Sequence, residues 1–85
     1  MNYMNKIKDL KLAEIEVGRS VRITKIDDGG AFKEKLISMG LLPGREVEVI
    51  SARGRGPVVI KVNETRLALG HGMAQKIYVR LDPDL

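Results

Sequence analysis

Short runs of alternating apolar and polar residues cover much of the chain, a pattern typical of strands that bury one face. A first segment from Leu10 to Val17 is spaced irregularly, and it predicts a short strand followed by a loop. In the last run we expect Ile77, Val79 and Leu81 to point inward. The runs that alternate are Ser20–Ile26, Arg45–Ile50, Val58–Val62, Thr65–Leu69 and Lys76–Leu81.

One segment has helical spacing instead. Phe32, Leu36 and Met39 lie at i, i+4 and i+7, which predicts a helix over Ala31–Met39 that packs one apolar face on the sheet. The preceding pair Asp27–Asp28 offers carboxylates that we expect to cap the start of this helix. A helix inserted after the second strand therefore interrupts an otherwise β sequence.

The end of the predicted helix carries strong turn signals. Gly40 suits the left-handed position that follows a helix, and Leu41 is the apolar residue that commonly folds back over the last turn. In the segment 42–45, Pro43 presets one φ angle and Gly44 supplies a positive one, which predicts a type II turn. The chain is therefore expected to reverse sharply here.

Length and element order together favour one small mainly β domain. The chain has 85 residues and no internal repeat, which leaves room for a single core. Five to six short strands with one inserted helix are best satisfied by a sheet curled into a small β-barrel. We expect the domain over residues 10–82, with a flexible N-terminal segment over 1–9 and a C-terminal tail over 83–85.

Composition restricts the environment and the chemistry. Apolar residues make up 44% and charged residues 31% of the chain, a balance typical of a folded domain. There is no cysteine, which excludes disulfides and thiolate sites and suits a reducing interior. No long apolar run is present, so we expect neither a signal peptide nor a membrane span, and a cytoplasmic location.

Few residues are suited to catalysis or to metal binding. The single histidine, His71, lies between two glycines and has no cysteine to activate, so we predict no enzyme and no cofactor. The oxygen ligands available, Asp27–Asp28, Asp82 and Asp84, do not have the spacing of a metal site. We therefore predict no metal site and interpret His71 as a turn histidine.

Nucleic acid binding is also disfavoured. The net charge of +4 arises from 15 basic residues interleaved with 11 acidic ones. Only three residues are aromatic, and Tyr78 alone is suited to stack on a base, whereas small barrels that bind single strands usually offer several stacking platforms. The loop Arg53–Gly56 is interpreted as a solvated hairpin connection.

A longer pattern resembles a known family. The segment Leu36–Gly44 contains Met-Gly-Leu-x-Pro-Gly after a helix, and the pattern continues through Arg45–Val49, Gly56–Val62 and Leu67–Gly70. Together these motifs resemble the ferrous-iron transport protein A family and cover nearly the whole chain from Leu10 to Leu81. The resemblance implies an SH3-like barrel.

The resemblance also implies a partner. It predicts a cytoplasmic accessory protein of ferrous-iron uptake that contacts a GTP-hydrolysing ferrous-iron permease and reaches the membrane only through that partner. The alternative is an SH3-like regulatory or nucleic-acid-binding module related to the C-terminal domain of iron-dependent repressors. Self-association stays open.

We place the partner contact at the corner between helix and strand. Leu42 precedes a proline in a tight turn and has no evident local partner, so we expect it to anchor a transient contact, with nearby charges setting orientation and association rate. The hypothesis that both leucines are buried stays open beside it. The residues predicted for this contact are Leu41, Leu42, Pro43, Lys33, Lys35 and Arg45.

Overall fold

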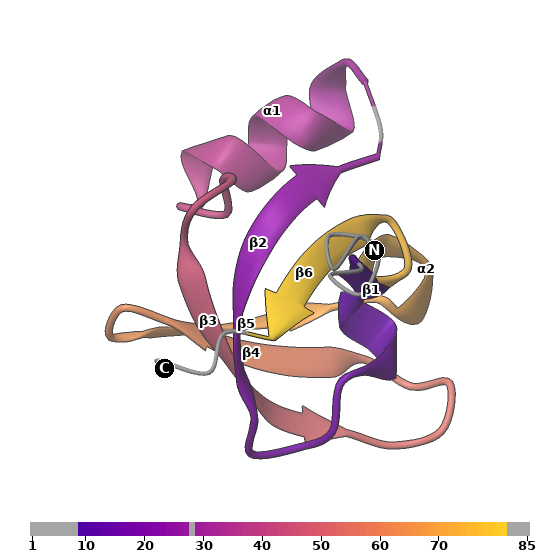
Figure 1. The fold of residues 1–85 in the computed structure, drawn as a ribbon. Coiled ribbons are helices and arrows are strands. Elements are labelled where there is room, and N and C mark those ends of the chain that lie inside the picture. The colour runs from indigo at the N-terminus through magenta and orange to yellow at the C-terminus, as the bar shows by residue number, and fades with distance from the viewer. Residues whose placement is uncertain (1–8, 28, 82–85) are drawn as a thin grey trace, which may run out of the picture.

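One antiparallel sheet forms the wall of a small barrel (Figure 1). The computed structural model describes residues 9–27 and 29–81, and within them the strand order is β1-β6-β2-β3-β4-β5. The strands are β1 (Leu10–Lys11), β2 (Ser20–Ile26), β3 (Glu46–Ala52), β4 (Val58–Val62), β5 (Thr65–Leu69) and β6 (Ile77–Leu81). The helices are the 3-10 turn η2 (Leu12–Glu14), α1 (Ala31–Ser38) and the single turn α2 (His71–Ala74).

The predicted barrel with one inserted helix is therefore confirmed. The flexible N-terminal segment predicted for 1–9 lies, apart from Asp9, outside the described residues, as does the tail predicted for 83–85. Asp9 is exposed and forms an ion pair with Arg80 of β6, in which Asp9 Oδ1 lies 3.2 Å from Arg80 Nη2. The start of β1 is thereby held against the end of β6.

The core is built from the alternate residues that the pattern predicted to face inward. Apolar side chains from every long strand fill the barrel, joined by side chains from η2, α1 and α2. Those less than 3% exposed include Leu12, Val21, Ile23, Leu36, Leu41, Val47, Val49, Val58, Ile60, Val62, Ile77 and Val79.

Leu81 is the exception to this alternation. It pairs with Val21 and so lies on the inner face, yet it is 39% exposed. The register agrees with the prediction that Leu81 points inward, but at this last residue of β6 the inward position is exposed.

Two register shifts curve the sheet. One lies between Ile23 and Lys25 where β2 pairs with β6, and the other between Val49 and Ser51 where β3 pairs with β4. Bulges increase local bending and twist, which helps a sheet to close on itself. The second shift also lets Ser51 and Ala52 keep pairing with β4, so β3 runs two residues beyond the strand that alternation predicted.

Helix α1 begins differently from the prediction. Its N-cap residue is Gly30, with φ of 74°, and no side chain donates or accepts a capping hydrogen bond. Asp27 therefore does not cap the helix through a side-chain hydrogen bond, and the part of the prediction that concerns Asp28 lies outside the described residues. The glycine supplies a backbone angle that a carboxylate-bearing residue would adopt only with strain.

The end of α1 follows the prediction closely. Leu41 N–H donates to the Leu36 carbonyl at 2.9 Å, and Gly40 N–H donates to the Ile37 carbonyl at 2.9 Å. This pair of bonds, with Gly40 at φ of 94°, is the Schellman motif that ends many helices. Leu36 and Leu41 are both fully buried, so the motif is closed by apolar side chains.

Helix α1 lies over one end of the barrel (Figure 1). Leu36 is its only residue less than 9% exposed, while Phe32 and Met39 are half-buried against the core, which confirms the predicted apolar face. The chain leaves the helix through the corner that leads into β3.

Candidate functional site

The corner between α1 and β3 is a type II turn, as predicted. Arg45 N–H donates to the Leu42 carbonyl at 3.0 Å, and Gly44 has φ of 94° at the third position of the turn. Pro43 occupies the second position, where its fixed φ is favourable, and it is exposed.

This turn is bonded to strand β2. Gly44 N–H donates to the Ile23 carbonyl at 2.7 Å, and Ile23 N–H donates to the Arg45 carbonyl at 2.9 Å. The Arg22 guanidinium adds a bond to the Gly44 carbonyl at 3.0 Å. These three bonds tie Gly44 and Arg45, the second half of the turn, to β2 and so fix its conformation against the barrel.

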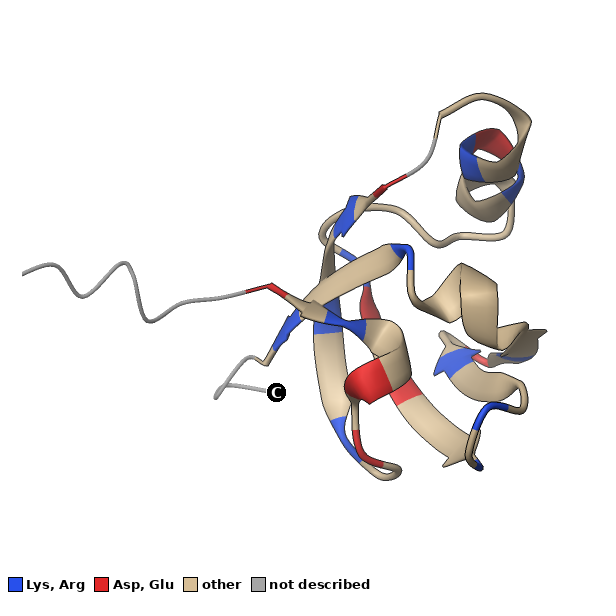
Figure 2. Ribbon diagram, turned by 90° about the vertical axis from the view of Figure 1, so that its right-hand side faces the viewer, with Lys and Arg blue, Asp and Glu red and all other residues tan. Residues whose placement is uncertain are grey.

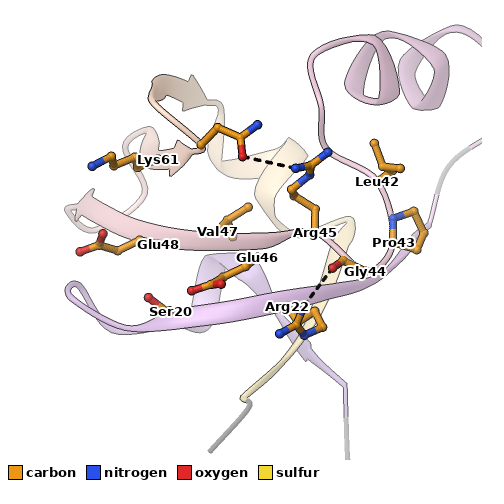
Figure 3. Close-up of a pocket in the computed structure, with 11 residues that line it drawn as sticks. Ser20, Arg22, Leu42, Pro43, Gly44, Arg45, Glu46, Val47, Glu48 and Lys61 are labelled. Carbon is orange, nitrogen blue, oxygen red and sulfur yellow. Dashed lines mark hydrogen bonds between the residues drawn. The ribbon is translucent and has the colours of Figure 1, made fainter. Parts of the chain in front are cut away.

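A groove of about 660 Å³ opens beside the corner (Figure 3). Its walls come from β2, the turn, β3 and the β4–β5 hairpin. The lining residues are Ser20 and Arg22, residues 42–45, residues 46–48, Lys61 and Asn63.

Charges of both signs line this groove. Arg45 donates to the Asn63 amide oxygen at 3.3 Å across the groove, while Arg22 lies opposite Glu46 in the β2–β3 register (Figure 3). Groups of this kind orient a partner and raise its association rate more than they add affinity. Leu42 adds an aliphatic side chain to this mostly polar lining.

The predicted contact residues fall into two groups. Leu42, Pro43 and Arg45 line the groove, and Leu42 is half-buried. Lys33 and Lys35 are exposed on α1 and do not line the groove. Figure 2 shows basic and acidic segments interspersed over the barrel and α1, so the charge does not gather on one element.

The prediction that Leu41 contacts a partner directly is wrong. It is fully buried, so it supports the helix end and cannot touch a partner in this conformation. Of the two adjacent leucines, only Leu42 has solvent-exposed surface.

Sequence reasoning missed the remaining lining residues. Arg22, Glu46 and Lys61 sit at polar positions of alternating strands, which by themselves indicate only the outer face. The signal that joins them is the strand register, and only the folded sheet provides it.

The described residues contain no group of three or more His, Cys, Asp or Glu side chains placed to hold a metal ion. His71 Nε2 lies 3.0 Å from the Gln75 amide nitrogen, one turn along the chain. Tyr78 is half-buried with Lys25 Nζ 5.5 Å from its ring centre, so it is not an open stacking platform. Over the same part of the chain no helix is long and apolar enough to cross a bilayer.

Comparison with known proteins shows which family the chain belongs to. The model of the FeoA domain matches residues 10–81, which is most of the chain. The chain belongs to the FeoA family. The resemblance read from the Met-Gly-Leu-x-Pro-Gly motif is thereby confirmed, and with it membership of a family of ferrous-iron transport.

Two FeoA relatives are similar in sequence. A protein of Methanocaldococcus jannaschii named "Putative Fe(2+) transport protein A" is 38% identical over 68 residues, which is 80% of this chain and 82% of the relative. A fusion of Fe(2+) transport protein A with the Fe(2+) transporter FeoB, from Porphyromonas gingivalis, is 27% identical over 73 residues. That match spans 85% of this chain and 9% of the fusion protein.

Solved FeoA structures share the fold. An iron uptake regulatory protein (FeoA) of known crystal structure is 34% identical in sequence and superposes with a TM-score of 0.80. The match covers 86% of this chain and 97% of that one. A Stenotrophomonas maltophilia FeoA, complexed with zinc and described as an SH3 domain protein, has a TM-score of 0.72 at 25% identity over 82% of this chain and 88% of that one. The SH3-like fold is therefore confirmed. The T. acidophilum IdeR, at 21% identity and a TM-score of 0.79 over 87% of this chain and 34% of that one, shares the fold alone.

Proposed function

We propose that this FeoA chain is a cytoplasmic, non-enzymatic accessory protein of ferrous-iron uptake that acts by contact with a GTP-hydrolysing ferrous-iron permease. The observation that carries the proposal is the Porphyromonas gingivalis fusion, in which a similar segment is joined to the Fe(2+) transporter FeoB in one chain. Domains joined covalently in one organism commonly act together as separate chains in another. The proposed chain reaches the membrane only through this permease.

The corner groove supports a protein contact better than a small-molecule site. It is open and mixed in charge, whereas pockets for small molecules are concave and mostly apolar. Leu42 and Pro43 provide an apolar rim on a turn whose backbone is already bonded to β2. A preformed surface loses little conformational entropy on binding, which favours recognition by a modest contact area.

Charges near the corner would then orient the permease. Arg45 lines the groove, and Lys33 and Lys35 are exposed on the helix that leads into it. Exposed rim charges change association rate and salt dependence more than they change affinity. We therefore assign anchoring to Leu42 and orientation to these three cations.

The experiment compares Leu42→Ser with Val17→Ser. Both changes remove a surface aliphatic side chain, but Val17 is 54% exposed in the turn before β2 and does not line the groove. We expect Leu42→Ser to fold and to lose permease capture and ferrous-iron uptake, and Val17→Ser to keep both. Thermal unfolding of each variant separates loss of binding from loss of fold.

Two results would contradict this proposal. In the first, a folded Leu42→Ser chain still captures the permease and supports uptake, which removes the corner as the contact. In the second, the parent chain captures no permease from membranes under conditions where uptake depends on it, which removes the partner itself.

A further inference from the structure

Strand β5 has an open edge. It is the last strand of the sheet, and β4 is its only strand neighbour among the described residues. Four of its five residues are at least partly exposed, whereas β4 alternates buried and half-buried residues. Within the described chain, no further backbone hydrogen bond joins residues 65–69 to another segment. Such an edge presents N–H and C=O groups that can pair with an added strand.

The outer face of this edge carries two cations side by side. Lys61 of β4 lies directly opposite Arg66 of β5, so both side chains stand on the same face of the sheet. Like charges at directly opposite positions repel each other. Neither residue forms an ion pair within the described part of the chain, where the pair identified joins Asp9 and Arg80. The acidic residue in register with them on this face is Glu48, which lies opposite Lys61 on the side away from β5.

We propose that β5 accepts an extended segment of a partner protein as an additional strand, with an acidic residue of that segment opposite Arg66. The backbone edge supplies the main-chain bonds, and Arg66, whose cross-strand neighbour is Lys61 and not an acidic residue, supplies the charge complementarity. This surface adjoins the corner groove, which Lys61 also lines, but Arg66 and the edge of β5 do not line that groove, and the inference does not require the permease to be the partner.

The register predicts the sequence of the segment. Val59 pairs with Ala68 on the same outer face as the Lys61 and Arg66 pair, two residues along each strand. An added strand therefore places one side chain beside Arg66 and another, two residues away, beside Ala68. The segment should carry Asp or Glu two residues from an aliphatic side chain.

A second copy of this chain fits the edge poorly. The sequence of β5, Thr-Arg-Leu-Ala-Leu, contains no acidic residue. Pairing of two such strands would bring further positive charge to an edge that already has two cations, on a chain of net charge +4.

The test uses a displayed library of linear peptides of about eight residues, a length typical of single strands. The whole chain is the target. We expect enriched peptides to carry Asp or Glu two residues from an aliphatic residue, and a synthetic copy to bind Arg66→Glu about tenfold more weakly. Arg19→Glu makes the same charge change at an exposed residue before β2, and it should leave binding unchanged.

Further measurements separate strand addition from simple charge attraction. N-methylation of alternate peptide amides should abolish binding in one of the two alternations, because an added strand uses every second N–H. A peptide with Lys in place of the acidic residue should recover binding to Arg66→Glu. In the free protein, Arg66→Glu should raise the unfolding temperature, since it replaces the repulsion with an attraction to Lys61.

The inference is overturned if enriched peptides lack the acidic residue, if Arg66→Glu binds them as the parent does, or if both N-methylated peptides bind normally. It is also overturned if sedimentation shows a dimer of the parent chain that Arg66→Glu disrupts, because the occupant is then a second copy.

Discussion

Replacement of Gly44 by alanine tests the geometry of the corner directly. Gly44 has φ of 94°, and a Cβ atom built on it meets no heavy atom within 4 Å. The loss of unfolding free energy in Gly44→Ala therefore comes from the backbone conformation and not from steric crowding by neighbours. That cost is about 1 to 2 kcal/mol for a residue with a Cβ atom, reduced by the lower entropy of the unfolded alanine chain.

Gly72→Ala is the matched control. A Cβ atom at Gly72 also meets nothing within 4 Å, but Gly72 lies inside α2 and has no positive φ. Alanine is favoured over glycine by about 0.5 to 1 kcal/mol inside a helix, so this variant should be as stable as the parent or more stable. The two substitutions are chemically identical and should shift stability in opposite directions.

Thermal and urea unfolding followed by circular dichroism measure both variants. For a domain of this size 1 kcal/mol corresponds to about 4 to 8 °C, so the lower melting temperature of Gly44→Ala should be plainly resolved. Equal stability of Gly44→Ala and the parent would refute the type II turn. A loss of stability in both variants would show that the backbone angle is not what distinguishes them.

Three further outcomes are expected. Leu41→Ala should lower the free energy of unfolding by about 2 to 5 kcal/mol, because Leu41 is fully buried at the helix end, and urea unfolding measures this loss. Arg45→Ala should cost less than about 1 kcal/mol in the same assay, since it removes one exposed hydrogen bond to Asn63. His71→Ala should leave stability and ferrous-iron uptake nearly unchanged, and titration calorimetry that finds a tight ferrous site lost in this variant would contradict the interpretation of His71.

The barrel core could be predicted from the sequence because the signal is local. In β4, Val58, Ile60 and Val62 alternate with Val59 and Lys61, and the three alternate residues are the buried ones. The helix stop was equally readable, since glycine positions that need positive φ are encoded by the residue itself.

Two of the differences from the predictions depend on contacts distant in sequence, and the third is local to the start of α1. Ser51 and Ala52 look like loop residues, but a register shift against β4 keeps them in β3. Leu81 continues the alternation of β6, and only the three-dimensional limit of the barrel leaves it exposed. At the start of α1, Gly30 takes the cap position that the upstream carboxylates were expected to serve.

The candidate site was readable only in part. The turn at Leu42 and Pro43 follows from short-range chemistry, whereas the groove beside it depends on Arg22 and Lys61, which come from strands on either side of β3. Nothing in the spacing of these residues along the chain indicates that they share a surface. Burial of Leu41 rather than Leu42, by contrast, follows from the sequence, because Leu41 is the apolar residue after Gly40 that closes the Schellman motif.

Pairing of β1 with β6 has a consequence for the order in which the barrel can be assembled. Leu10 lies opposite Val79, so a short linker between these strands could join them, and the exposed β3–β4 loop at Gly54 could become the new pair of ends. Such a circular permutant would keep every strand neighbour while making the β6–β1 contact local and the β3–β4 contact distant. Since folding rates depend on the sequence separation of contacts, we expect the permutant to keep its fold and to form the contact between the joined strands before the β3–β4 contact.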